Sequence, residues 1–115
     1  MNPKISIILP SYNYAQLLVT ALASISAQTE KSWELVAVDD GSTDDSLEIL
    51  QRFAEARAPQ VRVFTHPGGE NRGLAQSVAL ARGHCRGEFV AFLDADDFLY
   101  PESLDRKRTR LNSSH

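Results

Sequence analysis

Apolar residues gather in four short runs along the chain, at residues 5–9, 33–38, 61–64 and 89–93. These runs are rich in Ile, Val, Leu and Phe, and each is too short for a typical helix. Their length and composition predict four β-strands. The first run is almost continuously apolar, a pattern that favours a central strand of a parallel sheet.

Between these runs, apolar positions recur at helical spacing. One face of a helix predicted over residues 14–28 carries Leu17, Leu18, Ala21, Leu22 and Ile25. Further helices are predicted from a cap at Ser42 or Thr43 to Arg57, over residues 74–83, and from Glu102. The order β-α-β-α-β-α-β predicts an α/β fold, in which a parallel sheet has helices on both faces. This α/β/α sandwich is expected to form one domain over residues 1–104.

Polar residues directly follow three of the four predicted strands. They form the segments Pro10-Ser11-Tyr12-Asn13, Asp39-Asp40-Gly41-Ser42 and Asp94-Ala95-Asp96-Asp97. Because ligands of open parallel sheets bind at the carboxyl ends of the strands, we expect five carboxylates to converge there. Such crowding of like charge favours a bound divalent cation, Mg²⁺ or Mn²⁺. The alternative interpretation is that these aspartates only cap helices and end strands.

The composition narrows the function classes. The chain has 115 residues, with 12 Lys and Arg against 15 Asp and Glu, and a net charge of −3, which argues against a nucleic-acid partner. No apolar run approaches the roughly 18 residues of a membrane span, and no signal peptide is recognisable. The single cysteine, Cys85, excludes an internal disulfide and predicts a reducing, cytoplasmic compartment.

The last eleven residues differ from the rest of the chain. Residues 1–104 carry 8 basic and 14 acidic side chains, a net charge of −6, whereas residues 105–115 hold four of the 12 basic residues. The segment DRKRTRLNSSH resembles the translation of a sequencing adapter, which predicts a non-native tail on a fragment. The alternative is a disordered basic tail. Either way, residues 105–115 are expected to make few contacts with the domain.

Taken together, the motifs of residues 1–104 resemble those of the family 2 glycosyltransferases, which have the GT-A fold. The resemblance is carried, in order along the chain, by the segments SIILPSYN (6–13), SAQT (26–29), ELVAVDDGSTD (34–44), NRG (71–73), GEFVAFLDADD (87–97) and Pro101. The resemblance implies transfer of a sugar from a nucleoside-diphosphate-sugar donor to a hydroxyl acceptor, which is a glycan, a lipid-linked group or another alcohol. It also implies that this chain is the nucleotide-sugar-binding N-terminal part.

The family resemblance also implies roles for individual residues. Asp40 matches the aspartate that hydrogen-bonds the nucleotide base, and Pro10 and Tyr12 match positions that line the base pocket. Asp94 and Asp96 match the D-x-D motif; Asp94 is expected to approach the ribose or the metal. Asp96 is expected to bind a divalent cation, Mn²⁺ or Mg²⁺, directly. Two interpretations stay open for Arg72, which either reaches the diphosphate or is a solvated surface residue.

Two departures from the family pattern are visible. Val78 and Ala79 stand where many members have an Arg-Asn pair. No residue matches the family's catalytic base, an acidic residue of the C-terminal half that deprotonates the acceptor for inverting transfer. The base, the acceptor site and any membrane contact, at the inner face of the plasma membrane, are therefore expected beyond this chain, and the chain alone is expected to be inactive.

Two alternative functions would require other motifs at the ends of the predicted strands. A sugar-phosphate nucleotidyltransferase would need a Gly-rich, basic loop after the first strand, and the chain has Ser11-Tyr12-Asn13-Tyr14 there. A phospho-receiver module would need an Asp pair after the first strand and a lysine after a later one, and no lysine occurs between Lys31 and Lys107. His66 and His84 lack spacing suited to a metal site and are interpreted as surface residues.

Overall fold

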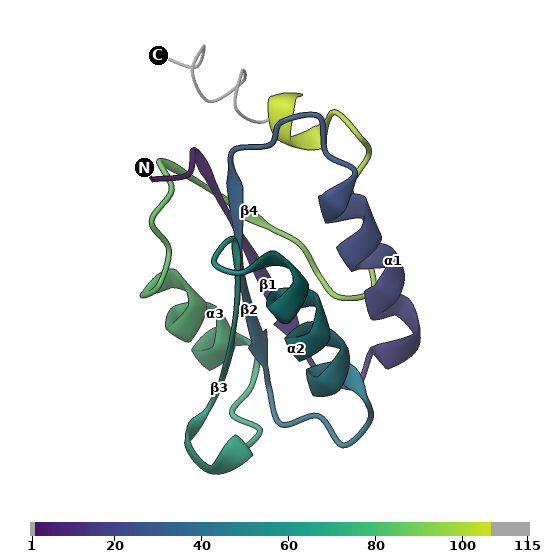
Figure 1. The fold of residues 1–115 in the computed structure, drawn as a ribbon. Helices are drawn as coiled ribbons and strands as arrows, with labels where there is room; N and C mark the ends of the chain where they lie inside the picture. Colours follow the sequence, from purple (N-terminus) through teal and green to yellow (C-terminus); the bar gives the residue numbers. More distant parts are fainter. Residues whose placement is uncertain (1, 107–115) are drawn as a thin grey trace.

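The structure of the chain is a computed structural model that describes residues 2–106 (Figure 1). Its elements are β1 (Ile5–Ser11), α1 (Ala15–Ser26), β2 (Trp33–Asp39), α2 (Ser46–Arg57), β3 (Val61–Thr65), a 3-10 turn η1 (Pro67–Gly69), α3 (Leu74–Arg82) and β4 (Phe89–Phe92). Residues 103–106 add a short helical turn. The predicted alternation of strands and helices is confirmed.

The four strands form one parallel sheet in the order β3-β2-β1-β4. Strand β1 is central, as its continuous apolar sequence predicts. It pairs in register with β2 from Ile5 opposite Trp33 to Ser11 opposite Asp39. This register brings the carboxyl ends of β1 and β2 to the same level, and that edge of the sheet carries the polar segments.

Alternating side chains of each strand face opposite sides of the sheet. Ile7, Leu9 and Leu35 belong to the larger core, which α1 and α2 cover, whereas Ile8 and Val36 pack with α3 on the other face. Figure 1 shows this arrangement, with α1 and α2 on one side of the strands and α3 on the other. The molecule is therefore the predicted α/β/α sandwich.

Helix α2 begins later than predicted, at Ser46 rather than beside Ser42 or Thr43. The side chains expected to cap the helix contact the β1–α1 loop instead. The Asn13 amide donates to Ser42 Oγ (3.0 Å), and Asn13 Oδ1 accepts from Thr43 Oγ1 (3.4 Å) and from the Thr43 amide (2.8 Å). Because these long-range hydrogen bonds compete with local capping, the turn after β2 extends to residue 45.

The end of the described chain packs on α1. Leu104 is fully buried, and its amide donates to Gln28 Oε1 (3.0 Å). Thr29 Oγ1 donates to the Asp105 carboxylate, so the expectation of few contacts does not hold for this first residue of the predicted tail. Residues 107–115 lie outside the described residues, and the prediction for them stays open.

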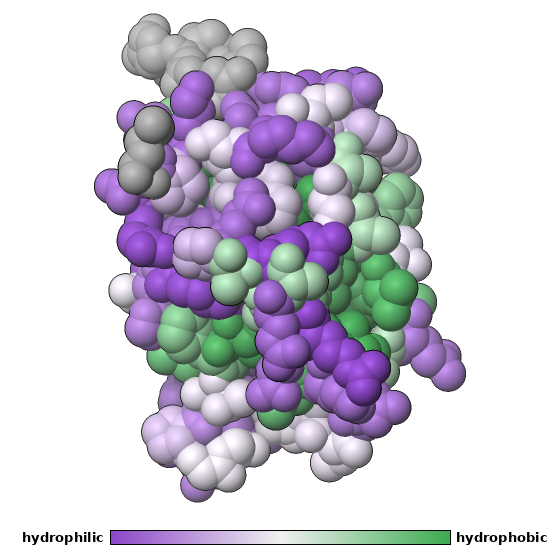
Figure 2. Space-filling view, viewed as in Figure 1, coloured by the Kyte–Doolittle hydropathy of each residue, from purple (hydrophilic) through white to green (hydrophobic). Residues whose placement is uncertain are grey.

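An apolar groove lies away from the strand ends. Val19, Leu22, Ile49 and Phe53 line it between α1 and α2, and apolar side chains gather over this side of the molecule in Figure 2. Of the helices in residues 2–106, none has the length and apolar character that crossing a membrane requires.

Candidate functional site

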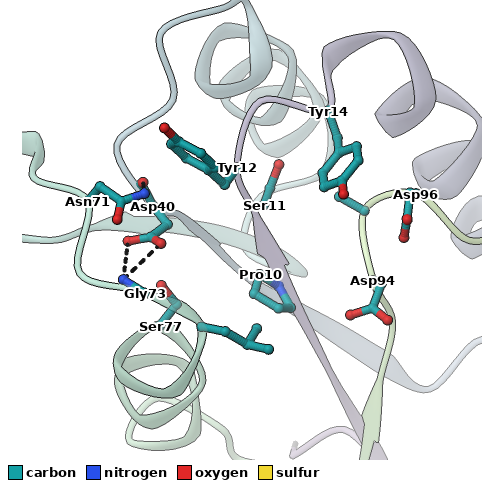
Figure 3. Close-up of a pocket in the computed structure, with 12 residues that line it drawn as sticks. Pro10, Ser11, Tyr12, Tyr14, Asp40, Asn71, Gly73, Ser77, Asp94 and Asp96 are labelled. Atoms are coloured by element: carbon teal, nitrogen blue, oxygen red, sulfur yellow. Dashed lines mark hydrogen bonds between the residues drawn. The ribbon is translucent and has the colours of Figure 1, made fainter.

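A cavity of about 460 Å³ opens at the carboxyl ends of the strands. Its lining residues are Pro10, Ser11, Tyr12, Tyr14, Asp40, Asn71, Gly73, Leu74, Ser77, Asp94, Ala95 and Asp96. They come from β1 and the loop after it, the turn after β2, the start of α3 and the segment after β4 (Figure 3). The polar segments that follow three strands in the sequence therefore meet around one space, as predicted for an open parallel sheet.

The loop that carries the two cavity tyrosines is held by hydrogen bonds that its end donates to side chains at the start of α2 and in the turn before it. The Tyr14 amide donates to Ser46 Oγ (3.2 Å), and the Ala15 amide donates to Asp44 Oδ2 (3.1 Å). Hydrogen bonding from Ser46 lowers the pKa of Asp44, which keeps this carboxylate ionised and able to accept. Tyr12 is 44% exposed, so its ring is available as a wall of the cavity.

The two aspartates that end β2 have different surroundings. Asp39 follows the alternation of the larger core face, and its Oδ2 accepts a hydrogen bond from the Ser42 amide (3.0 Å). Asp40 belongs to the α3 face and lines the cavity. Its Oδ1 accepts from the Arg72 amide (2.7 Å), and the Gly73 amide donates to both carboxylate oxygens at 3.0–3.2 Å. Figure 3 shows the two bonds from Gly73.

On the opposite side of the cavity, Asp94 and Asp96 are both exposed. Figure 3 shows their carboxylates on the side of Pro10 away from Asp40. Within residues 2–106, no hydrogen bond or ion pair engages either side chain, whereas Asp97 Oδ1 accepts from the Phe98 amide (2.8 Å). Three carboxylates thus line the cavity, from Asp40, Asp94 and Asp96. The expectation that five converge is corrected, because Asp39 and Asp97 are used in turns.

Asp94 and Asp96 supply only some of the ligands that Mg²⁺ or Mn²⁺ requires. Two free carboxylates are hard oxygen ligands of the kind that these cations prefer. No group of three or more His, Cys, Asp or Glu side chains in the described part of the chain could hold a metal ion. The two aspartates therefore fit a cation whose remaining ligands are water and phosphate oxygens, which is how Mg²⁺ is commonly bound.

Five of the six predicted site residues line the cavity: Pro10, Tyr12, Asp40, Asp94 and Asp96. Arg72 does not, because its guanidinium pairs with Glu70 at 2.9 Å and only its backbone amide contacts the site residue Asp40. Sequence reasoning gave no role to Ser11, Tyr14 or Ser77. Ser11 adjoins two predicted residues, and its Oγ is buried with no hydrogen-bond partner within residues 2–106.

His66 is not the surface residue that the sequence indicated. It is 4% exposed, and its Nε2 lies 3.0 Å from Ser77 Oγ and 3.3 Å from Asp40 Oδ1. The position directly follows β3, an edge strand, where a polar residue is expected to be solvated. His66 is buried because the loop through η1 passes over it on the way to α3. The residues close to His66 in the sequence do not predict this course of the loop.

Comparison with known proteins agrees with this geometry. The family model described as glycosyl transferase family 2 matches residues 6–109. The chain therefore belongs to glycosyl transferase family 2, and neither the nucleotidyltransferase nor the phospho-receiver alternative is supported. An uncharacterized glycosyltransferase of Nostoc sp., alr2836, is 40% identical over 104 residues, which cover 90% of this chain and 31% of that protein.

Two solved structures resemble the fold closely. S. aureus TarS (residues 1–349) in complex with UDP-GlcNAc has a TM-score of 0.85 at 29% identity, covering 97% of this chain and 32% of TarS. The mannosyltransferase PcManGT from Pyrobaculum calidifontis, in complex with GDP-Man and Mn²⁺, has a TM-score of 0.75 at 32% identity, covering 85% and 29%. These matches confirm the GT-A fold, and the chain spans about a third of the length of these relatives.

Proposed function

We propose that this chain binds the nucleoside-diphosphate-sugar donor of a metal-dependent glycosyltransferase, which transfers the sugar to a hydroxyl acceptor. The observation that carries the proposal is the single cavity that collects Asp40, Tyr12, Asp94 and Asp96 at the strand ends. TarS with UDP-GlcNAc and PcManGT with GDP-Man support the class of donor, because both share this fold.

The base and the diphosphate would occupy different sides of the cavity. Tyr12 and Pro10 supply flat, apolar contact for a base, and Asp40 supplies a fixed acceptor for a base N–H group. Arg72 enters this proposal through its amide, which holds Asp40, since its guanidinium is engaged with Glu70.

Asp96, with Asp94, would hold the divalent cation beside the diphosphate. Both carboxylates lack protein partners in the described part of the chain, so binding a cation there breaks no interaction. When bound, Mn²⁺ or Mg²⁺ supplies positive charge that offsets the charge of the diphosphate leaving group. Asp94 and Asp96 also set where the donor phosphates lie, because a carboxylate-bound cation is a fixed point for phosphate oxygens.

Donor binding without efficient sugar transfer is the expected behaviour of the 115-residue chain. Deprotonation of an acceptor hydroxyl needs a general base within hydrogen-bonding reach. Of the three cavity carboxylates, Asp40 already accepts from two backbone amides, and Asp94 and Asp96 are assigned to the cation. We therefore place the base, and the glycan, lipid-linked or other hydroxyl acceptor, outside the group of cavity residues in this chain.

Isothermal titration calorimetry tests the proposal. The chain is titrated with UDP and with GDP, in Mn²⁺ and in EDTA, and transfer is assayed with UDP-GlcNAc and GDP-Man. We expect one diphosphate to bind at least about tenfold more tightly with Mn²⁺. Equal or absent binding under all conditions would refute the donor-site assignment, and efficient transfer by this chain would refute the placement of the base.

A further inference from the structure

His66, Asp40 and Ser77 form a buried polar cluster that joins β3, β2 and α3. His66 Nε2 lies 3.0 Å from Ser77 Oγ and 3.3 Å from Asp40 Oδ1. The side chains of His66 and Asp40 are 4% and 8% exposed, and Ser77 is fully buried. Asp40 and Ser77 line the cavity, whereas His66 lies behind them, so it can act on a ligand only through its neighbours.

The position of the imidazole proton follows from these distances. A carboxylate carries no hydrogen at neutral pH and can only accept. An unprotonated Nε2 would place its lone pair 3.3 Å from the Asp40 carboxylate, an arrangement that is repulsive in a buried site. A hydrogen on Nε2 is instead donated to Ser77 Oγ, and its positive partial charge also lies beside Asp40 Oδ1, so both contacts become attractive.

With this proton in place, the hydrogen-bonding capacity of Asp40 is nearly filled on one side. Oδ1 accepts from the Arg72 amide and makes a second contact with the Gly73 amide, and His66 Nε2 lies 3.3 Å from it. Oδ2 receives only the Gly73 amide at 3.0 Å. A carboxylate oxygen has about two acceptor sites. Oδ2 therefore keeps one site for a ligand, and the orientation of that site depends on what holds Oδ1.

We infer that His66 is a positioning residue of the donor site: its Nε2–H, held by Ser77 Oγ, lies 3.3 Å from Asp40 Oδ1 and orients the carboxylate electrostatically, so that Oδ2 accepts from the nucleotide base. This inference rests on the proposed function for the role of the base. The contacts that orient Asp40 come from three segments: the loop before α3, the residue after β3, and, through the hydrogen bond between His66 and Ser77, α3 itself. Among the described residues, the hydrogen-bond donors to this carboxylate are backbone amides, and His66 provides the polar side-chain contact to it.

The test compares two substitutions at His66. His66→Gln keeps an N–H donor near the position of Nε2, whereas His66→Phe keeps the ring volume and removes the donor. His84→Phe is the matched control, because His84 stacks on Phe64 with ring centroids 3.9 Å apart and does not line the cavity. Affinity for UDP and GDP is measured by calorimetry in EDTA, so that the cation does not contribute, and each variant is checked for folding by its Tm.

We expect His66→Phe to weaken nucleotide affinity roughly tenfold, the scale of one hydrogen bond to a charged group. His66→Gln is expected to recover most of this loss, and His84→Phe to leave the affinity unchanged. In an Asp40→Asn background, His66→Phe should cause no further loss, because its effect passes through the charged carboxylate. An unchanged affinity for His66→Phe, or an equal loss in both backgrounds, would overturn the inference.

A second measurement separates this inference from the donor-site proposal. ¹⁵N NMR of the ligand-free chain reports which imidazole nitrogen of His66 carries the proton. We expect the Nε2–H form, with an Nε2 resonance that shifts in the Asp40→Asn variant. If neither UDP nor GDP binds, the donor-site proposal fails by itself. A proton found on Nδ1 alone overturns the positioning role whatever the binding result.

Discussion

Gly41 and Asn71 lie in such close contact that a Cβ atom on Gly41 would stand 2.7 Å from the Asn71 amide nitrogen. Gly41 also has a φ of 75°, in the left-handed region. On the same side, Asn71 Nδ2 donates to the backbone carbonyl of Asp40 (3.0 Å). The turn after β2 and the loop before α3 are therefore packed backbone against backbone, and a residue larger than glycine would force them apart.

Replacing Gly41 with Ala should destabilise the chain and weaken nucleotide binding together. The left-handed φ alone costs about 1–2 kcal/mol for a residue with a Cβ, and contact with Asn71 adds to it. The matched control is Gly69→Ala, because Gly69 has a φ of 70° but open space around its Cβ position. We expect only Gly41→Ala to lose affinity for UDP or GDP. Urea unfolding and calorimetry on both variants measure this, and equal effects would argue against the packed turn.

Replacing Asp96 with Asn should remove most of the gain in nucleotide affinity that Mn²⁺ provides. The side chain has no protein partner among residues 2–106, so its loss should leave the Tm within about 2–4 °C, as for other surface substitutions. Asp97→Asn is the control, since Asp97 is a neighbouring exposed carboxylate outside the cavity lining. Calorimetry with and without Mn²⁺ compares the two variants. A similar loss of the Mn²⁺ effect in both would contradict the assignment of Asp96 as the metal ligand.

The sequence predicts the sheet well because its two central strands, β1 and β2, are buried on both faces. Continuous apolar runs mark β1, β2 and β4, and the central place of β1 follows from the same pattern. The start of α2 is less predictable. Ser42 and Thr43 are residue types that commonly cap helices, but they bind Asn13, some 30 positions away in the sequence. A pattern of neighbouring residues carries no information about such a distant competitor.

The site can be predicted from the sequence where its residues directly follow strands. It cannot be predicted where the course of a loop brings a residue into the site. Asp40, Asp94 and Asp96 sit at strand ends, so topology alone brings them to one edge. Side chains alternate between the two faces of β2, so Asp39 and Asp40 lie on opposite faces. This two-residue period is present in the sequence and predicts that Asp39 does not line the cavity with Asp40. His66 and Ser77 meet only because the loop between β3 and α3 closes over them. That contact depends on tertiary packing, which the hydrophobic periodicity of the sequence does not predict.

At the opposite end of the sheet, Glu34 is a buried carboxylate whose pKa should control stability in acid. Burial by itself would raise the pKa of Glu34, but hydrogen bonds from Ser6, the Arg86 amide and Arg62 outweigh it and hold the pKa below the ordinary 4.5. The distances are 2.5 Å from Ser6 Oγ, 2.6 Å from the Arg86 amide and 2.7 Å from Arg62 Nη2. These bonds fasten the segment between α3 and β4 to the sheet.

Because the folded pKa of Glu34 is lowered, its stabilising contribution is complete above about pH 4.5 and is lost as the pH falls through the folded pKa. Glu34→Gln should therefore lower the free energy of unfolding by about 3 kcal/mol at pH 7, since it leaves Arg62 without its buried partner. The difference between wild type and variant should shrink below pH 4.5, where the wild-type carboxyl also becomes neutral.

Glu48→Gln is the control: its pair with Arg52 is exposed, and the loss should stay under about 0.5 kcal/mol. Urea unfolding of the three chains between pH 7 and pH 3 gives these values. A Glu34→Gln difference that is constant with pH would show that the hydrogen bonds, and not the ionised carboxylate, stabilise this end of the sheet.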